Sequence, residues 1–236
     1  LKLTGMPLYD CVVNSFATAG TGGFAILNLS IGGYHSPAVE IIIGVFMLLF
    51  SVNFALYFLI LQGKWKQALD SDELRFFGAV VSLSVVLITF NIAGQYGSPL
   101  TALRHAFFQV ASIISTTGFA TADFCLWPQF SQIIFILLML CGACAGSTGG
   151  GIKISRIIIM CKTAKQDLMR VLHPHAVTTV RFEGKPLDDK TVFGVRTYMN
   201  LYLIIFVLST MVVESRMSFF SDALGHSGFT GIAIGV

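Results

Sequence analysis

The sequence predicts an all-α membrane protein built from a repeated unit of a crossing helix, a short re-entrant helix, a glycine turn and a second crossing helix. Three observations lead to this fold class: the composition, the apolar stretches and a short pattern that recurs. Of the 236 residues, 55% are hydrophobic and 11% are charged, whereas a soluble domain carries about 25% charged residues. We therefore expect lipid to cover much of the surface.

Four apolar stretches are candidates for membrane spans, each of which needs about 20 residues. The first two, Ile41–Leu61 and Phe76–Ala93, qualify directly. The third, Ile133–Ala145, runs into a glycine cluster and resumes at Ile152–Met160, so it qualifies only if both halves are counted together. The fourth, Tyr198–Val213, qualifies if its helix begins several residues upstream. The pattern predicts four crossings and a multi-pass protein of the cell membrane.

The basic residues indicate how these spans are oriented. Three of them lie between the first two spans and nine follow the glycine cluster, which together are twelve of the fifteen Lys and Arg residues. Cytoplasmic loops carry an excess of Lys and Arg, so we expect the loops 62–75 and 161–196 to be cytoplasmic. The segments 1–38, 94–132 and 214–236 are then extracytoplasmic.

One short pattern recurs in these outer segments: a helix candidate, then small or hydroxyl residues, then Gly-Phe. The copies read YDCVVNSFATAGTGGF at Tyr9–Phe24, HAFFQVASIISTTGF at His105–Phe119 and SDALGHSGF at Ser221–Phe229. A Ser-Pro helix start at Ser98 precedes the second copy, and its helix of about four turns is too short to span a bilayer. We therefore expect re-entrant loops, because irregular backbone inside a membrane must be buried in protein or line water.

The chemistry of these turns predicts an ion pore lined by a selectivity filter. Backbone carbonyls replace the water of a dehydrated cation when glycine lets the chain turn inward. Thr and Ser add hydroxyl oxygens, and the C-terminal end of the preceding helix is partly negative. One such turn alone favours an ordinary tight turn, but three at matching positions favour the filter. The residues expected to bind a dehydrated monovalent cation are Thr21, Gly22, Gly23, Thr116, Thr117, Gly118, Phe119, Ser227 and Gly228.

The glycine cluster in the third span predicts a gate. Gly142–Gly151 contains five glycines, and each glycine inside a helix costs about 1 kcal/mol relative to alanine. A loop lining the pathway beneath the filter would satisfy the freed backbone groups; a rigid kink for helix packing is the alternative. The predicted gate residues are Gly142, Cys144, Gly146, Ser147, Thr148, Gly149, Gly150 and Gly151.

Three motifs resemble a known family. TAGTGGF at 18–24, STTGFAT at 115–121 and GACAGSTGGGIKISR at 142–156 are similar to the second filter, third filter and broken inner helix of TrkH-type subunits of the Trk/Ktr/HKT potassium transporters. The resemblance covers roughly residues 10–213 and implies potassium transport through four repeats around one pore. It also implies a homodimer, a cytoplasmic nucleotide-binding regulatory subunit, and no cofactor in this chain besides the transported potassium ion.

The same resemblance divides the chain into three parts. Residues 1–62 would hold the second pore loop and inner helix, 63–165 the third repeat with its broken inner helix, and 166–236 a cytoplasmic loop, an outer helix and a partial fourth pore loop. The alternatives are sodium conduction or co-transport, and a non-conducting structural membrane subunit. We expect no enzyme, because no nucleophile or metal-ligand set converges within the spans, and no nucleic-acid binding, because no basic stripe is interleaved with aromatics.

Overall fold

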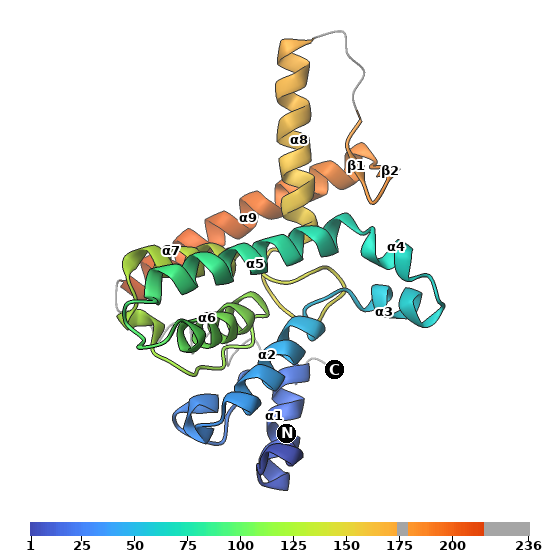
Figure 1. The fold of residues 1–236 in the computed structure, drawn as a ribbon. Coiled ribbons are helices and arrows are strands. Elements are labelled where there is room, and N and C mark those ends of the chain that lie inside the picture. Colours follow the sequence, from blue (N-terminus) through green and yellow to red (C-terminus); the bar gives the residue numbers. More distant parts are fainter. Residues whose placement is uncertain (174–178, 215–236) are drawn as a thin grey trace, which may run out of the picture. The chain divides into compact units, whose positions relative to one another are not determined.

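The structure, a computed structural model, describes residues 1–173 and 179–214 and divides into two units, 1–187 and 188 onward. The first unit (Figure 1) contains α1 (Leu8–Ala19), α2 (Pro37–Phe50), α3 (Phe54–Leu61), α4 (Trp65–Leu69), α5 (Asp72–Ile92), α6 (Pro99–Ile114), α7 (Gln129–Cys141), α8 (Ile154–Leu172) and the strands β1 (Arg181–Phe182) and β2 (Lys185–Pro186), with short 3-10 helices at Lys2–Thr4, Ser30–Tyr34 and Phe124–Leu126. The described part of the second unit is α9 (Asp189–Glu214). The predicted all-α class is confirmed.

The predicted spans correspond to helices, with one difference. In the described part of the chain, α5 and α9 are each long and apolar enough to cross a membrane alone. The third predicted span is broken as expected, since α7 ends at Cys141 and α8 begins at Ile154. The first predicted span is two helices rather than one: α2 and α3 are bent by 91° at a short break. Asn53 starts the second of them, because its side chain accepts a hydrogen bond from the backbone N–H of Ala55.

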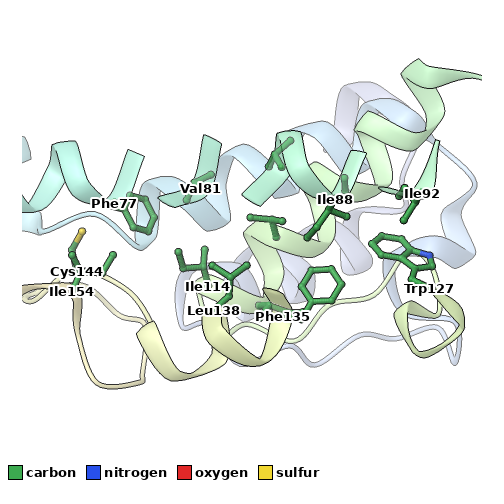
Figure 2. Close-up of a cluster of buried hydrophobic side chains, with 14 of the residues drawn as sticks. Phe77, Val81, Ile88, Ile92, Ile114, Trp127, Phe135, Leu138, Cys144 and Ile154 are labelled. Atoms are coloured by element: carbon green, nitrogen blue, oxygen red, sulfur yellow. The ribbon is translucent and has the colours of Figure 1, made fainter. Parts of the chain in front are cut away.

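The core of the first unit lies where α5, α6 and α7 pack against one another. One face of α5 carries residues at helical spacing, namely Phe77, Val81, Val85, Ile88 and Ile92. In Figure 2, Trp127 lies at the Ile92 end of this row, and Cys144 and Ile154 lie at the Phe77 end. One residue inside the glycine cluster and one just beyond it are therefore part of the same core as the spanning helix.

A partly buried ion pair joins α2 to α6. The Glu40 carboxylate lies 3.0 Å from the Arg104 guanidinium, and their side chains are 6% and 25% exposed. Gly44, one turn further along α2, allows a close approach, because a Cβ there would lie 2.6 Å from the ring of Phe107. A second buried cluster includes Ile43 and Met47 of α2, Phe108 of α6 and Phe119.

The short helix α1 is fixed to the 3-10 helix that follows it. The hydroxyl of Tyr34 donates to Asp10 at 2.8 Å, and the Asn14 amide donates to the same hydroxyl at 3.1 Å. Burial and the hydrogen bond to Asp10 raise the pKa of Tyr34. These bonds fix the first half of α1, the helix that leads into the first predicted filter turn.

Candidate functional site

The turns that follow α1 and α6 have the same hydrogen-bond pattern. The helices end at Ala19 and Ile114, which are 95 residues apart, and three backbone bonds recur with both partners shifted by that interval. The donor–acceptor pairs are Gly20–Phe16, Thr21–Thr18 and Gly22–Ala17 in the first turn, and Ser115–Ala111, Thr116–Ile113 and Thr117–Ser112 in the second. The sequence repeat is thus a repeat of backbone geometry.

Both turns also place the same two positions in the left-handed region. Thr21 and Thr116 have φ values of 50° and 59°, and the glycines two residues later, Gly23 and Gly118, have 69° and 87°. A left-handed residue other than glycine costs roughly 1–2 kcal/mol. The surrounding contacts must hold the two threonines in this conformation, which is common at binding sites.

The two turns lie side by side. A Cβ added to Gly23 would be 2.0 Å from the carbonyl oxygen of Thr117. The segments next to the turns are also bonded, since Gly32 N–H donates to the Ala120 carbonyl at 3.0 Å and Ala120 N–H donates to Ser30 Oγ at 3.1 Å. The structure therefore brings two of the three predicted turns together, and the third, with Ser227 and Gly228, lies outside the described residues.

The threonine hydroxyls in these turns form hydrogen bonds within the protein. Thr21 Oγ1 donates to the Thr148 carbonyl at 3.1 Å, and Thr116 Oγ1 accepts from Gly150 N–H at 2.6 Å. Thr117 Oγ1 is buried 2.7 Å from Ser115 Oγ. The Phe119 side chain, which is 1% exposed, packs in the second buried cluster. These side chains brace the turns through contacts within the protein.

The glycine loop, Gly142–Gly151, lies against both turns through its hydrogen bonds with Thr21 and Thr116. Its two ends meet, because a Cβ on Gly142 would be 2.5 Å from the Gly150 carbonyl oxygen and one on Gly151 would be 2.7 Å from Gly142 Cα. Both end glycines are left-handed, with φ values of 68° and 82°. Residues with side chains would not permit this close return of the chain.

Inside the loop, Ser147 Oγ closes a tight turn by donating to the Cys144 carbonyl at 2.6 Å. The break between α2 and α3 supplies further partners, since Cys144 N–H donates to the Ser51 carbonyl at 3.0 Å and Phe54 N–H donates to the Gly146 carbonyl at 3.1 Å. Backbone groups freed inside a membrane must find partners in the protein, so the two breaks satisfy each other.

Sequence reasoning missed one residue of the site, Glu73 in the first turn of α5. Its side chain is buried, and its Oε1 accepts from Ala145 N–H at 2.7 Å and from Ser155 N–H at 3.1 Å. The sequence signal that could have identified Glu73 is an acidic residue in the first turn of an apolar membrane span. In the part of the chain that the structure describes, no group of three or more His, Cys, Asp or Glu residues is arranged to hold a metal ion.

A cavity of about 730 Å³ lies beside the segment that follows the Gly118 turn. Its lining includes the paired Glu40 and Arg104, together with His105 and Asp123. The ring of His105 is stacked on Tyr96, with the ring centroids 5.0 Å apart. Arg104, His105 and Asp123 belong to the segment 94–132, which is predicted to be extracytoplasmic, so the cavity lies on the outer side of the turns in that topology.

Comparisons with known proteins show the family of this chain. The TrkH family model, described as a cation transport protein, matches residues 3–227. The Trk system potassium uptake protein TrkH of Salmonella typhimurium is 34% identical over 216 residues, which are 90% of this chain and 45% of that protein. The Trk system potassium uptake protein TrkG of Escherichia coli is 33% identical over 217 residues, with 90% and 44% covered.

A solved structure has the same fold. The crystal structure of the potassium transporter TrkH from Vibrio parahaemolyticus matches with a TM-score of 0.82 at 33% identity, covering 87% of this chain and 45% of that one. The chain thus spans a little under half the length of the relatives it matches. Its family match covers nearly all of its own residues, and its apolar helices are those of a multi-pass membrane protein. The chain therefore belongs to the TrkH family of cation transport proteins.

Proposed function

We propose that this chain forms part of a potassium-conducting pathway in which backbone carbonyls of the Gly23 and Gly118 turns coordinate the dehydrated ion. One observation carries the proposal: two turns 95 residues apart share their hydrogen bonds and their left-handed positions, and they lie in contact. Two ordinary tight turns need not share a strained backbone conformation, and they need not lie in contact. The relatives named above are potassium uptake proteins, which favours K⁺ as the ion.

A cation needs oxygens on all sides, and two turns supply only part of such a ring. The remaining oxygens would come from further repeats of the complete transporter, to which the turn predicted from the sequence at Gly228 would contribute. As the resemblance to the family implies, the complete transporter is a homodimer that binds a nucleotide-binding subunit on its cytoplasmic side.

The glycine loop is proposed as the gate of this pathway. It contacts both turns through Thr148 and Gly150, and its irregular backbone depends on hydrogen bonds to the neighbouring break. Left-handed glycines at its ends, Gly142 and Gly151, are suited to act as hinges. Displacing such a loop would open the space beneath the turns without changing the carbonyls that select the ion.

The substitution Gly118→Ser in the complete transporter tests the filter. Gly118 has φ +87°, and no described atom lies within 4 Å of a Cβ placed there. The serine therefore fits sterically but strains the backbone and adds a hydroxyl near the carbonyls. The K⁺/Na⁺ uptake ratio in a transport-deficient cell should fall, whereas Gly97→Ser should leave it unchanged, because that glycine has equal space among the described atoms and no left-handed φ. An unchanged ratio for Gly118→Ser contradicts a filter role.

A further inference from the structure

A single carboxylate connects the two sides of the glycine loop to the start of α5. We propose that Glu73 is the positioning residue that holds the loop against the turns, and that the β1–β2 hairpin controls this hold through Glu183. The inference rests on the gating role proposed above and adds to it the residue that keeps the gate in place and the segment that acts on that residue.

The Glu73 side chain is placed to hold both sides of the loop at once. It is 4% exposed, and one oxygen, Oε1, accepts from Ala145 N–H and Ser155 N–H. Ala145 lies within the loop, and Ser155 lies in the first turn of α8, where backbone N–H groups have no partner inside the helix. A carboxylate is favoured at this positive helix end, and its hydrogen bonds are charge-assisted and stronger than neutral ones.

Several other bonds that hold the loop are neutral or lie inside it. The threonines of the two turns and the backbone of the α2–α3 break provide neutral partners. The ammonium of Lys153 donates to the Gly149 carbonyl, which closes the loop on itself. The bonds to Glu73 differ from these, because they join the loop to a spanning helix through a charged group. Their loss should therefore release the loop more than the loss of one threonine bond.

The β1–β2 hairpin reaches the same helix end. Glu183 and Gly184 form its two-residue turn with φ values of 51° and 73°, the signs required by a tight hairpin of type I′. Glu183 Oε1 accepts from Ser71 Oγ at 2.7 Å and from Glu73 N–H at 3.4 Å. Phe182, next to the turn, packs against the main core. The hairpin thus supplies a carboxylate to the first turn of α5, as Glu73 does to the first turn of α8.

These contacts form a continuous mechanical connection from the hairpin to the loop. The hairpin belongs to the 161–196 segment that the charge pattern predicts to be cytoplasmic, where a regulatory partner would bind. Moving Glu183 would alter the backbone of Glu73 directly, since the two are hydrogen-bonded. Asp72, the adjacent residue, provides a matched control because it pairs with Lys162 of α8 at 2.6 Å, on a half-exposed surface outside the loop.

The rate of Cys144 alkylation reports how firmly Glu73 holds the glycine loop, and it does so independently of transport. Cys144 is buried, with a relative exposure of 0%, and precedes Ala145 in the loop. In a complete transporter whose other cysteines are replaced by serine, Glu73→Gln should raise the rate of reaction with N-ethylmaleimide about tenfold or more, because the amide oxygen still accepts but its hydrogen bonds are no longer charge-assisted. Asp72→Asn should leave the rate within about twofold, since a half-exposed ion pair contributes little. An unchanged rate for Glu73→Gln overturns the proposal.

A double-variant experiment tests the hairpin. Glu183→Gln should raise the alkylation rate in the same direction as Glu73→Gln, and the double variant should react no faster than the faster single variant, because both changes break one connection. If the rate increase of the double variant is the product of the two single increases, Glu73 and Glu183 act independently. That result overturns control by the hairpin. The exposed Cys161, kept as the single cysteine in a parallel set, should react equally in all variants and reports correct folding. Glu73→Asp, which keeps the negative charge near the Cys144 thiol but shortens the reach to the loop, should raise the rate in the same direction, and it decides in place of Glu73→Gln if that variant does not fold.

Flux measurements separate this inference from the proposed gate. Faster Cys144 alkylation with unchanged ion flux would support the role of Glu73 in holding the loop and would contradict the gating role of the loop. Raised flux after loop deletion, with Cys144 alkylation unchanged in Glu73→Gln, would support the gate and overturn the role of Glu73. Agreement of both measurements, with flux and alkylation raised together by Glu73→Gln, is the result we expect.

Discussion

The carbonyl oxygen of Thr117 occupies the place where a side chain on Gly23 would have to lie, with only 2.0 Å between that oxygen and a Cβ built on Gly23. Real Cβ atoms do not approach a backbone oxygen so closely, so any larger residue at position 23 must push the two turns apart. The contact is between repeats that are 95 residues apart in the chain, and it makes the spacing of the two turns depend on one glycine.

The first prediction compares alanine at the two equivalent glycines. Gly23→Ala should destabilise the complete transporter by about 2–4 kcal/mol, since it adds overpacking to left-handed strain, and it should abolish most potassium uptake. Gly118→Ala should cost only the strain, about 1–2 kcal/mol, because the described atoms leave its Cβ position open. Thermal unfolding in detergent and uptake in cells measure both. Equal effects of the two substitutions would show that the turns are not in contact.

The second prediction concerns the glycine loop. Deleting Gly146–Gly150 removes the contacts of Thr148 and Gly150 with the turns. Ion flux in the absence of the regulator should rise, while the K⁺/Na⁺ ratio should change little because the carbonyls of the turns remain. Thr116→Val, which removes one acceptor without changing the volume, should raise flux in the same direction but less.

Flux that stays low and regulated after this deletion would contradict the gate. The rigid-kink alternative predicts that outcome, because a kink needed only for helix packing would affect stability and leave regulation as it was. Unfolding temperatures of the deletion variant, measured beside the flux, separate a packing defect from an open gate.

The third prediction concerns orientation and uses cysteines already in the chain. Cys125 and Cys161 are both exposed, and the charge pattern places Cys125 outside and Cys161 in the cytoplasm. A membrane-impermeant maleimide applied to intact cells should label Cys125, whereas Cys161 and an introduced Asp189→Cys should react only after permeabilisation. Labelling of Asp189→Cys from outside would reverse the predicted topology.

The helices that were predicted well are those with local signals. The Ser-Pro start and the STTG end of α6 lie inside the segment itself, and the structure places the helix at Pro99–Ile114. The break in the third span was likewise predicted, because consecutive glycines disfavour a helix wherever they occur. The break at Ser51–Asn53 was missed, since Ile41–Leu61 is apolar almost throughout and nothing local interrupts it strongly.

The sequence by itself determined the membrane class, the repeated turns and the glycine loop, because composition, period and glycine content are properties of a segment and its neighbours. Only the tertiary structure decided which groups meet. Thr21 bonds Thr148 across 127 residues of chain, and Glu73 bonds Ala145 and Ser155 across 72 and 82. Backbone groups freed within a membrane require partners, but a segment does not specify which distant group supplies them, and folding alone brings Glu73 to the loop that it holds.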